Sequence, residues 1–233
     1  MIIKQPATTD IPALRDLWKQ AFGDTDGFLD IFFATGFSLD RCRCLTVNGT
    51  LASGLYWFDC ALGKEKLAYI YAVATGEAFQ RQGLCAALME ETHRHLKDLG
   101  YDGAILVPGT EDLRRYYQRF GYMNVGGIRQ KTVSTDALRA IDKQEYARLR
   151  RQYLPEGGVV QEGETLDFFA AFAKFYAGEG FVLAVTEENA ELLGNAPEGK
   201  DLCVRTPGDT PFAMYLPLEE HTEKPTYFGI ALD

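Results

Sequence analysis

The sequence predicts an α/β (α+β) fold, with a mixed central sheet in residues 1–130 and a smaller α+β domain in residues 131–233. Two observations support this prediction. Over residues 1–130, helical and strand-like patterns of apolar residues follow one another in the order helix, helix, strands, helix, strand, helix, strand. A new helical pattern then begins at Ser134 and leads into a further helix and four short strands.

The first domain begins with two helices and a hairpin. Residues 8–23 and 28–37 carry apolar side chains at helical spacing, and Gly23 ends the first of these helices. Residues 41–62 alternate between apolar and polar side chains on both sides of Asn48-Gly49. Because Asn-Gly favours the tight turn between antiparallel strands, this stretch predicts a β-hairpin.

Strands and helices then alternate to the end of the first domain. Residues 66–75 are an apolar, aromatic-rich strand, and residues 84–99 are a helix closed by Gly100. The remaining predicted elements are a strand at 102–109, a helix at 111–120 and strands within 121–133.

The second domain is predicted to combine helices at 134–154 and 164–177 with four strands. Residues 26–49 and 164–189 both pass from an Asp- and Phe-containing helix into a strand and a polar turn. Two interpretations of this weak similarity stay open: a truncated copy of the first domain, or chance. The four predicted strands lie at 180–186, 202–206, 211–218 and 226–233.

The composition excludes several classes of protein. With 46% hydrophobic and 12% aromatic residues, the chain can bury a large core and is not disordered. Its formal charge of −9 argues against nucleic acid as a partner. In residues 129–233, 18 acidic residues outnumber 11 basic ones, which either keeps the protein soluble or attracts cationic ligands. The sequence has no run of about 18 apolar residues, so no membrane span is expected.

The cysteines and histidines do not suggest a metal site. Five cysteines at irregular spacing predict packed, reduced thiols and therefore a cytoplasmic location. Cys42 and Cys44 alternate along a strand, and no second pair completes a zinc site. The N-terminus lacks the long apolar region of a signal peptide. His93 and His95 are two residues apart on a helix, so they point to different sides and are expected at the surface.

The stretch QRQGLCAALMEE, residues 80–91, has the chemistry of an anion site. No acidic residue lies between Ala78 and Met89, and Gly83 opens the helix without a Cβ that would block a close approach. A helix N-terminus offers unpaired N–H groups and partial positive charge, which suit a pyrophosphate, and Arg81 can add a direct contact. The alternative is an ordinary helix start that contains a glycine.

Two motifs in this order resemble the GNAT superfamily of acyl-CoA-dependent N-acyltransferases, over residues 2–130. Gln80 to Cys85 matches the family's pyrophosphate motif, Gln/Arg-x-x-Gly-x-Gly/Ala. Tyr116 to Tyr122 matches its aromatic-Tyr, short linker, Gly-Phe/Tyr motif. The sequence departs from the family pattern in three places: Cys85 replaces Gly or Ala, Glu77 replaces a frequent proline, and Thr110 replaces a frequent asparagine.

The resemblance implies a GNAT fold whose central sheet is splayed between the strand that ends at Thr75 and the strand near Ile105. Free backbone groups of Val73 and Thr75 would then pair with the pantetheine arm of acetyl-CoA, as an added strand does. The cofactor-binding residues implied in this way are Val73, Ala74, Thr75, Gln80, Arg81, Gln82, Gly83, Leu84, Cys85 and Ala86.

The resemblance also implies that Tyr117 is catalytic and protonates the departing thiolate of coenzyme A. A phenol of pKa about 10 and a thiol of pKa about 8.5 are close enough for this transfer. The alternative role for Tyr117 is that of a packed aromatic residue.

The attacking amine needs a base, and no residue stands out for this role. Tyr69, Tyr71 and Asp59 are candidates on the central strands, and the terminal carboxylate of Asp233 is another. Trp57 is a candidate for a wall of the substrate site.

The expected reaction is direct transfer of an acetyl group from acetyl-CoA to a primary amine of a small molecule or peptide, with no covalent enzyme species and no metal. The second domain lacks the pyrophosphate motif, so it is expected to close the acceptor cleft or to form a homodimer. Neither nucleic acid nor a membrane is expected as a partner. The alternative function is a non-catalytic acyl-CoA sensor.

Overall fold

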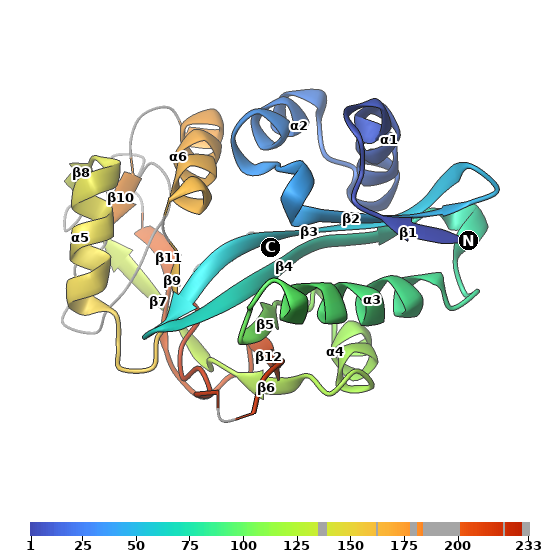
Figure 1. The fold of residues 1–233 in the computed structure, drawn as a ribbon. Helices are drawn as coiled ribbons and strands as arrows, with labels where there is room; N and C mark the ends of the chain where they lie inside the picture. The colour runs from blue at the N-terminus through green and yellow to red at the C-terminus, as the bar shows by residue number, and fades with distance from the viewer. Residues whose placement is uncertain (135–138, 162, 178–180, 184–200, 221, 230–233) are drawn as a thin grey trace.

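The computed structural model describes residues 1–134, 139–161, 163–177, 181–183, 201–220 and 222–229. A mixed central sheet runs through the molecule, with α1 and α2 on one face and α3 and α4 on the other (Figure 1). The predicted mixed α/β class is therefore confirmed.

The first elements follow the predicted order. The Asn48-Gly49 turn has positive φ at both residues, 50° and 83°, as a tight hairpin requires. Gly23 ends α1 with φ 74°. The elements are β1 (Ile2–Lys4), η1 (Thr8–Asp10), α1 (Ile11–Phe22), α2 (Asp26–Ile31), the π-helical η2 (Phe32–Gly36), η3 (Leu39–Arg41), β2 (Cys42–Val47), β3 (Thr50–Leu62) and β4 (Glu65–Thr75).

A turn and two helix–strand pairs follow β4. They are η4 (Glu77–Phe79), α3 (Leu84–Asp98), β5 (Gly103–Leu106), α4 (Glu111–Gln118) and β6 (Met123–Val125). The long helix predicted at 84–99 and the helix predicted at 111–120 are both confirmed within two residues at each end.

The second half departs from the prediction at two places, apart from the short strand at 160–161, which the sequence did not predict. The helix predicted at 134–154 is wrong at its start: a strand lies at 139–141, and the helix begins only at Lys143, where the Asp142 carboxylate accepts the Glu145 N–H at 2.7 Å. The elements are β7 (Ile128–Ser134), β8 (Arg139–Ile141), α5 (Lys143–Tyr153), β9 (Val160–Gln161), α6 (Glu164–Ala177), β10 (Phe181–Leu183), β11 (Asp201–Pro207) and β12 (Ala213–Pro217).

The strand predicted at 226–233 is the second departure. Its described part, residues 226–229, contains only an isolated bridge at Tyr227, and residues 230–233 lie outside the described residues. Tyr227 contributes a carbonyl that accepts the Val159 N–H at 2.9 Å, and Phe228 packs on Tyr69. This segment therefore packs against other parts of the protein without forming a regular strand.

Two strands from the second half, β9 and β12, belong to the first sheet, and β9 pairs antiparallel with the end of β3. The strand order is β1-β2-β3-β4-β5-β12-β6, and β12 pairs antiparallel with both β5 and β6. The division at residue 130 stays a prediction, but β12 crosses it. Alternation identifies a strand without identifying its partner, so the sequence did not indicate this pairing.

Residues 126–212 thus form a long excursion between two neighbouring strands. The chain leaves after β6 and returns before β12, and β7 pairs with β11 along the way out and back. The two segments nearly touch where they pass: a Cβ on Gly127 would lie 2.2 Å from the Gly208 carbonyl oxygen. Only glycine at position 127 allows this approach.

The second half repeats the opening order of the first. β8, α5, α6 and β10 follow one another as β1, α1, α2 and β2 do, apart from the short β9, and β10 pairs antiparallel with β8 as β2 does with β1. The truncated-copy interpretation stays a prediction.

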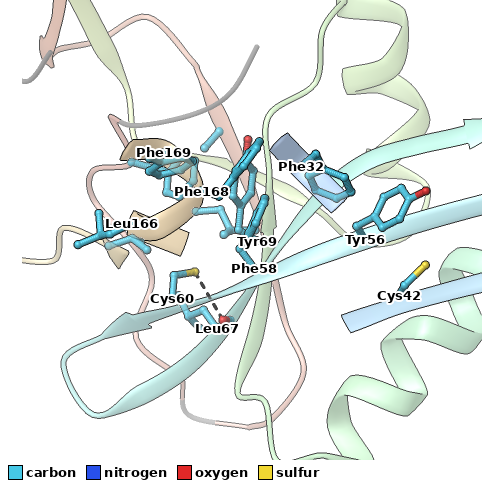
Figure 2. Packing of buried hydrophobic residues seen from close by; sticks show 14 of the residues in the cluster. Phe32, Cys42, Tyr56, Phe58, Cys60, Leu67, Tyr69, Leu166, Phe168 and Phe169 are labelled. Atoms are coloured by element: carbon cyan, nitrogen blue, oxygen red, sulfur yellow. Dashed lines mark hydrogen bonds between the residues drawn. The ribbon is translucent and has the colours of Figure 1, made fainter. Parts of the chain in front are cut away.

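An aromatic core joins the two halves. Phe168 on α6 stacks on Phe58 of β3 with ring centroids 5.5 Å apart, and it also meets Phe32 edge-on at 5.4 Å (Figure 2). All three side chains are almost fully buried. The second half therefore packs directly against the sheet of the first.

Three of the four cysteines whose side chains are described, Cys42, Cys44 and Cys60, are buried, and Cys85 is half-buried; all four are free thiols. None of the helices in the described part is long and apolar enough to cross a membrane. Within that same part, no three His, Cys, Asp or Glu side chains gather as a metal site would need.

Candidate active site

The sheet opens between β4 and β5. Their parallel pairing covers Leu67–Tyr69 and Gly103–Ile105 and then ends. A cavity of about 790 Å³ lies beyond this point, lined by the next residues of both strands, Tyr69–Val73 and Leu106–Gly109. The splayed sheet implied by the family resemblance is therefore confirmed, and the gap has the volume of a small-molecule site.

A β-bulge accompanies this divergence. Ala72 has a φ of 48°, and the pairing between β3 and β4 shifts register between Gly54 and Tyr56. A bulge bends the strand that carries it and increases its twist. The bulge in β4 therefore contributes to the separation of β4 from β5, next to the cavity.

Backbone direction distinguishes the three predicted strand residues. The Ala74 carbonyl accepts the Ser53 hydroxyl at 2.6 Å, and the Gly76 N–H donates to Ala52 at 2.9 Å, so Ala74 and Gly76 turn toward β3. Strand alternation turns the backbone of Thr75 away from β3, and its carbonyl accepts the Gln80 side-chain amide at 3.2 Å. Of the three, Val73 lines the cavity, and the pairing of this strand with a pantetheine arm stays a prediction.

The N-terminus of α3 is open. Gly83 precedes it with φ 78°, and no described side chain caps it. The first intrahelical bond runs from the Ala87 N–H to the Gly83 carbonyl at 3.0 Å, so the N–H groups of Leu84 to Ala86 precede that ladder. The first turn holds no acidic residue. These features leave a partly positive helix end available to an anion.

Two glutamines shape the loop before this helix. The Gln80 side-chain amide donates to the Thr75 carbonyl at 3.2 Å, and that of Gln82 donates to the Ala78 carbonyl at 3.0 Å. Arg81, between them, is exposed and has a φ of 59°. The amides thus hold the loop in place, while the guanidinium of Arg81 stays at the surface beside the helix start.

Cys85, which departs from the family pattern, joins three elements. Its thiol hydrogen-bonds with the side chains of Tyr116 on α4 and Thr75 on β4. The Thr75 hydroxyl lies 2.9 Å from that of Ser53 on β3. Burial raises the pKa of the Cys85 thiol, so it is a neutral hydrogen-bonding group rather than a thiolate nucleophile.

Tyr117 lies where the strands separate. It lines the cavity and is only 7% exposed. Burial, followed by the nearby Cys85, raises the pKa of Tyr117 above its usual value. The phenol therefore stays protonated at neutral pH and can donate a hydrogen bond to a group in the cavity. The structure brings this residue together with Val73 and with the β4 side of the gap.

The candidate bases are separated by the fold. Tyr69 and Tyr71 line the cavity. Asp59 lies elsewhere, where it accepts the Tyr101 hydroxyl and pairs with Arg41 at 3.8 Å. Asp233 lies outside the described residues.

The proposed tryptophan wall and the histidines need correction. Trp57 is 1% exposed and donates to the Tyr101 hydroxyl at 3.1 Å, whereas Trp18 lines the cavity. His93 is not a surface residue: it is largely buried, and its Nε2 lies 2.9 Å from the Tyr122 hydroxyl. The polarity of histidine suggested exposure, but the side of α3 that carries His93 packs against the end of α4.

Several cavity residues were missed by sequence reasoning. Asp24 and Phe22 come from the end of α1 and the turn after it, and Phe172 and Phe212 come from the second half. Asp24 follows the helix-ending Gly23, a place where any polar residue is ordinary, so nothing marked it out. Thr110, a departure from the family pattern, accepts the Leu113 N–H at 3.1 Å and caps α4.

The comparisons with known proteins agree with this geometry. A family model described as the acetyltransferase (GNAT) domain matches residues 3–125. The chain belongs to the GNAT family of acetyltransferases. Its matched region contains the splayed strands, the open helix start and Tyr117. A search of curated proteins found no match to this chain.

Solved structures share the fold over almost the whole chain. A probable N-acyltransferase from Enterococcus faecalis is 15% identical with a TM-score of 0.65, covering 93% of this chain and 72% of its own. A GCN5-related N-acetyltransferase from Anabaena variabilis is also 15% identical with a TM-score of 0.62, covering 94% and 73%. One from Kribbella flavida is 13% identical, with a TM-score of 0.58 and coverages of 92% and 70%. At such low identities, the similarity concerns the GNAT fold alone.

Proposed function

We propose that this protein transfers an acetyl group from acetyl-CoA to a primary amine. In the reaction, the amine nitrogen forms a bond to the acetyl carbonyl carbon, the carbon–sulfur bond breaks, the nitrogen loses a proton and the leaving sulfur gains one. The products are an N-substituted acetamide and the free thiol of coenzyme A. Nothing in this scheme requires a covalent bond to the enzyme.

One observation carries the proposal: the uncapped start of α3 follows, after the short η4, the strand that borders the cavity. The N–H groups of Leu84 to Ala86 would hold the pyrophosphate, and Arg81 would add a charged contact. The backbone of Val73, which lines the cavity, and of Thr75 would hold the pantetheine arm. The thioester would then lie in the cavity that Tyr117 lines.

Tyr117 would act on the leaving group. Its buried phenol is protonated, so it can donate a hydrogen bond to the sulfur as negative charge develops there. Such a donor contributes most in a site shielded from water, and the aromatic walls of this cavity provide that shielding.

The second half would close the acceptor side of the cavity. Phe172 on α6 and Phe212, just before β12, both line it. Arg114 on α4 holds the latter segment by donating to the carbonyls of Pro211 and Phe212 at 3.2 Å each. The wall is therefore fixed to the same helix that carries Tyr117.

The test compares Tyr117→Phe with Tyr116→Phe. We expect Tyr117→Phe to lower kcat by about 10²–10⁴-fold while changing the affinity for coenzyme A less than about threefold. Tyr116→Phe is the matched control, because it removes a neighbouring hydroxyl that contacts Cys85 rather than the cavity. The readouts are thiol release over a panel of amines and calorimetric titration with coenzyme A.

Two results would contradict the proposal. Full activity of Tyr117→Phe would remove the catalytic role of that residue. Tight binding of acetyl-CoA without acetylation of any amine would favour a non-catalytic acyl-CoA sensor instead.

A further inference from the structure

The acceptor side of the cavity is mainly aromatic. Trp18, Phe22 and Phe28 line it from α1 and α2, and Phe172 lines it from α6. The rings support one another: Trp18 and Phe28 have centroids 5.9 Å apart, and Phe28 meets Phe172 edge-on at 5.7 Å. These side chains can pack against an aromatic ring or an alkyl chain of a ligand. They offer few hydrogen-bond partners to hydroxyl groups of a ligand.

Charge in the cavity is sparse. Among the described residues that line it, Asp24 and Arg114 are the two with a formal charge. Arg114 already donates to the Asn124 amide oxygen at 2.7 Å, to two backbone carbonyls at 3.2 Å, and pairs with Glu111 at 3.3 Å. Its guanidinium is therefore engaged in holding the wall, and Asp24 is the charged group left to recognise a ligand.

Asp24 is held in place by the cavity wall itself. Its Oδ2 accepts the Trp18 indole N–H at 2.8 Å. A carboxylate offers about four lone-pair positions, so this bond fixes the group and leaves it able to accept hydrogen bonds from an ammonium. Aromatic faces close to the carboxylate would add cation–π attraction to the same ammonium.

From this arrangement we propose that the acceptor is a monoamine: one cationic nitrogen, held by Asp24, on an aromatic or alkyl body that packs against Trp18 and Phe28. The proposal rests on the acetyltransferase function above and names its substrate class. Spermidine or an aminoglycoside would bring additional ammonium or hydroxyl groups into the aromatic walls without enough partners, which disfavours their binding.

The same arrangement favours release of the product. The ammonium first loses one proton to solvent, and the neutral amine loses a second as the leaving sulfur gains one, so the product is a neutral amide without attraction to Asp24. The N-acetyl product should therefore bind more weakly than the amine, and its binding should not depend on the charge at position 24.

The test measures thiol release from acetyl-CoA with four amines: 2-phenylethylamine, hexylamine, spermidine and kanamycin. We expect kcat/KM for the two monoamines to be at least tenfold higher than for the other two. Preference for spermidine or kanamycin would overturn the substrate class and leave the acetyltransferase function intact.

Variants separate the charge of Asp24 from its structural role. Asp24→Asn keeps an oxygen that can accept the Trp18 N–H but removes the negative charge. We expect it to raise KM for 2-phenylethylamine at pH 7 at least tenfold while kcat changes less than threefold. Asp16→Asn, at an exposed position of α1, is the matched control and should change neither. An unchanged KM in Asp24→Asn would overturn the role of Asp24.

A binding measurement keeps the two proposals distinguishable. 2-Phenylethylamine is titrated into the protein saturated with coenzyme A, with wild type and Asp24→Asn in parallel. Charge-dependent binding without turnover would uphold the monoamine site and contradict the acetyltransferase function. Absence of binding of 2-phenylethylamine, together with no turnover of any of the four amines, would overturn both proposals.

Discussion

Helices α3 and α4 follow β4 and β5 on the two sides of the splayed gap, α3 after the short η4 and α4 after a loop, but their first turns differ. α4 begins at Thr110, whose hydroxyl accepts the Leu113 N–H, and has two acidic residues, Glu111 and Asp112, in its first turn. α3 begins at Gly83 without a capping side chain and without an acid. The start of α4 is capped by its own Thr110, and the start of α3 has no side-chain cap.

The open start of α3 is therefore not a general property of helices that follow the strands of this sheet. A capped, acidic start is the more stable choice for an isolated helix, because it satisfies N–H groups and complements the helix dipole. α3 has neither a capping side chain nor an acidic residue at the position where an anion would bind. The comparison is therefore evidence for a ligand that supplies what α4 supplies for itself.

The largest expected effect comes from giving α3 the acidic character of α4. Gly83→Asp places a carboxylate beside the proposed pyrophosphate, and a like charge about 4 Å away costs about 4 kcal/mol at an effective dielectric constant of 20. We expect the affinity for coenzyme A to fall about 10³-fold, measured by calorimetric titration.

Two matched variants isolate this charge. Gly83→Asn imposes the same strain at positive φ without the charge, and it should lose far less affinity. Gly100→Asp adds an acid to another open, positive-φ glycine at the far end of the same helix, where φ is 75°. Equal losses in all three variants would mean that the helix start is not an anion site.

The second effect concerns the contact between the two helices at His93. Burial lowers the pKa of His93 to about 4, below the usual 6.5. Between pH 6.5 and pH 4, His93 binds a proton in the unfolded chain but not in the folded protein. The free energy of unfolding therefore falls as the pH drops through this range. The loss amounts to about 3 kcal/mol in full.

His93→Gln should reduce this loss of stability at acidic pH, because glutamine can still hydrogen-bond to Tyr122 but does not titrate in this range. The check is urea unfolding at pH 7, 6, 5 and 4. Tyr122→Phe is the control, since it removes the hydrogen bond and leaves the buried imidazole, so the slope should persist. If His93→Gln loses as much stability between pH 7 and pH 4 as the wild type does, other groups cause the acid sensitivity.

A smaller effect is expected at Cys85, where the two helices are linked by a thiol and a phenol. Cys85→Ala and Tyr116→Phe each remove one partner of this hydrogen bond. We expect each to cost about 1 kcal/mol in the free energy of unfolding, and the double variant to cost less than the sum. Additive costs would show that the thiol contributes by packing alone.

The smallest effect on function should come from the cap of α4. Thr110→Ala removes the hydroxyl that accepts the Leu113 N–H and should cost about 1 kcal/mol in unfolding free energy. The affinity for coenzyme A should stay within about twofold of wild type. A large loss of affinity would mean that the start of α4 also contributes to the ligand site.

Most local elements of the fold could be predicted from the sequence because their signals lie within a few residues. The Asn48-Gly49 turn, the end of α1 at Gly23 and the helix α6 all follow from patterns of this kind. The failure at 134–154 has the same origin: the helical period continued smoothly across a stretch that contains β8 and the cap at Asp142.

The residues of the candidate site also fall into two groups, those in contiguous motifs and those brought together by packing between distant segments. The motifs from Gln80 to Cys85 and around Tyr117 were visible because they are contiguous. Asp24 and Trp18, which line the cavity, were not visible as site residues, because their importance arises only from what α1 packs against. The departure at Cys85 was noticed from the pattern, but its partners Thr75 and Tyr116 were not.

Residue types at short, fixed spacing are enough to predict the family resemblance, the open helix start and the position of the proposed catalytic tyrosine. The fold adds three features: β12 joins the first sheet, a bulge at Ala72 accompanies the opening between β4 and β5, and aromatic residues from both halves line the cavity together with Asp24. These features depend on strand pairing and side-chain packing between segments far apart in the chain, and short-range patterns contain no information about such partners.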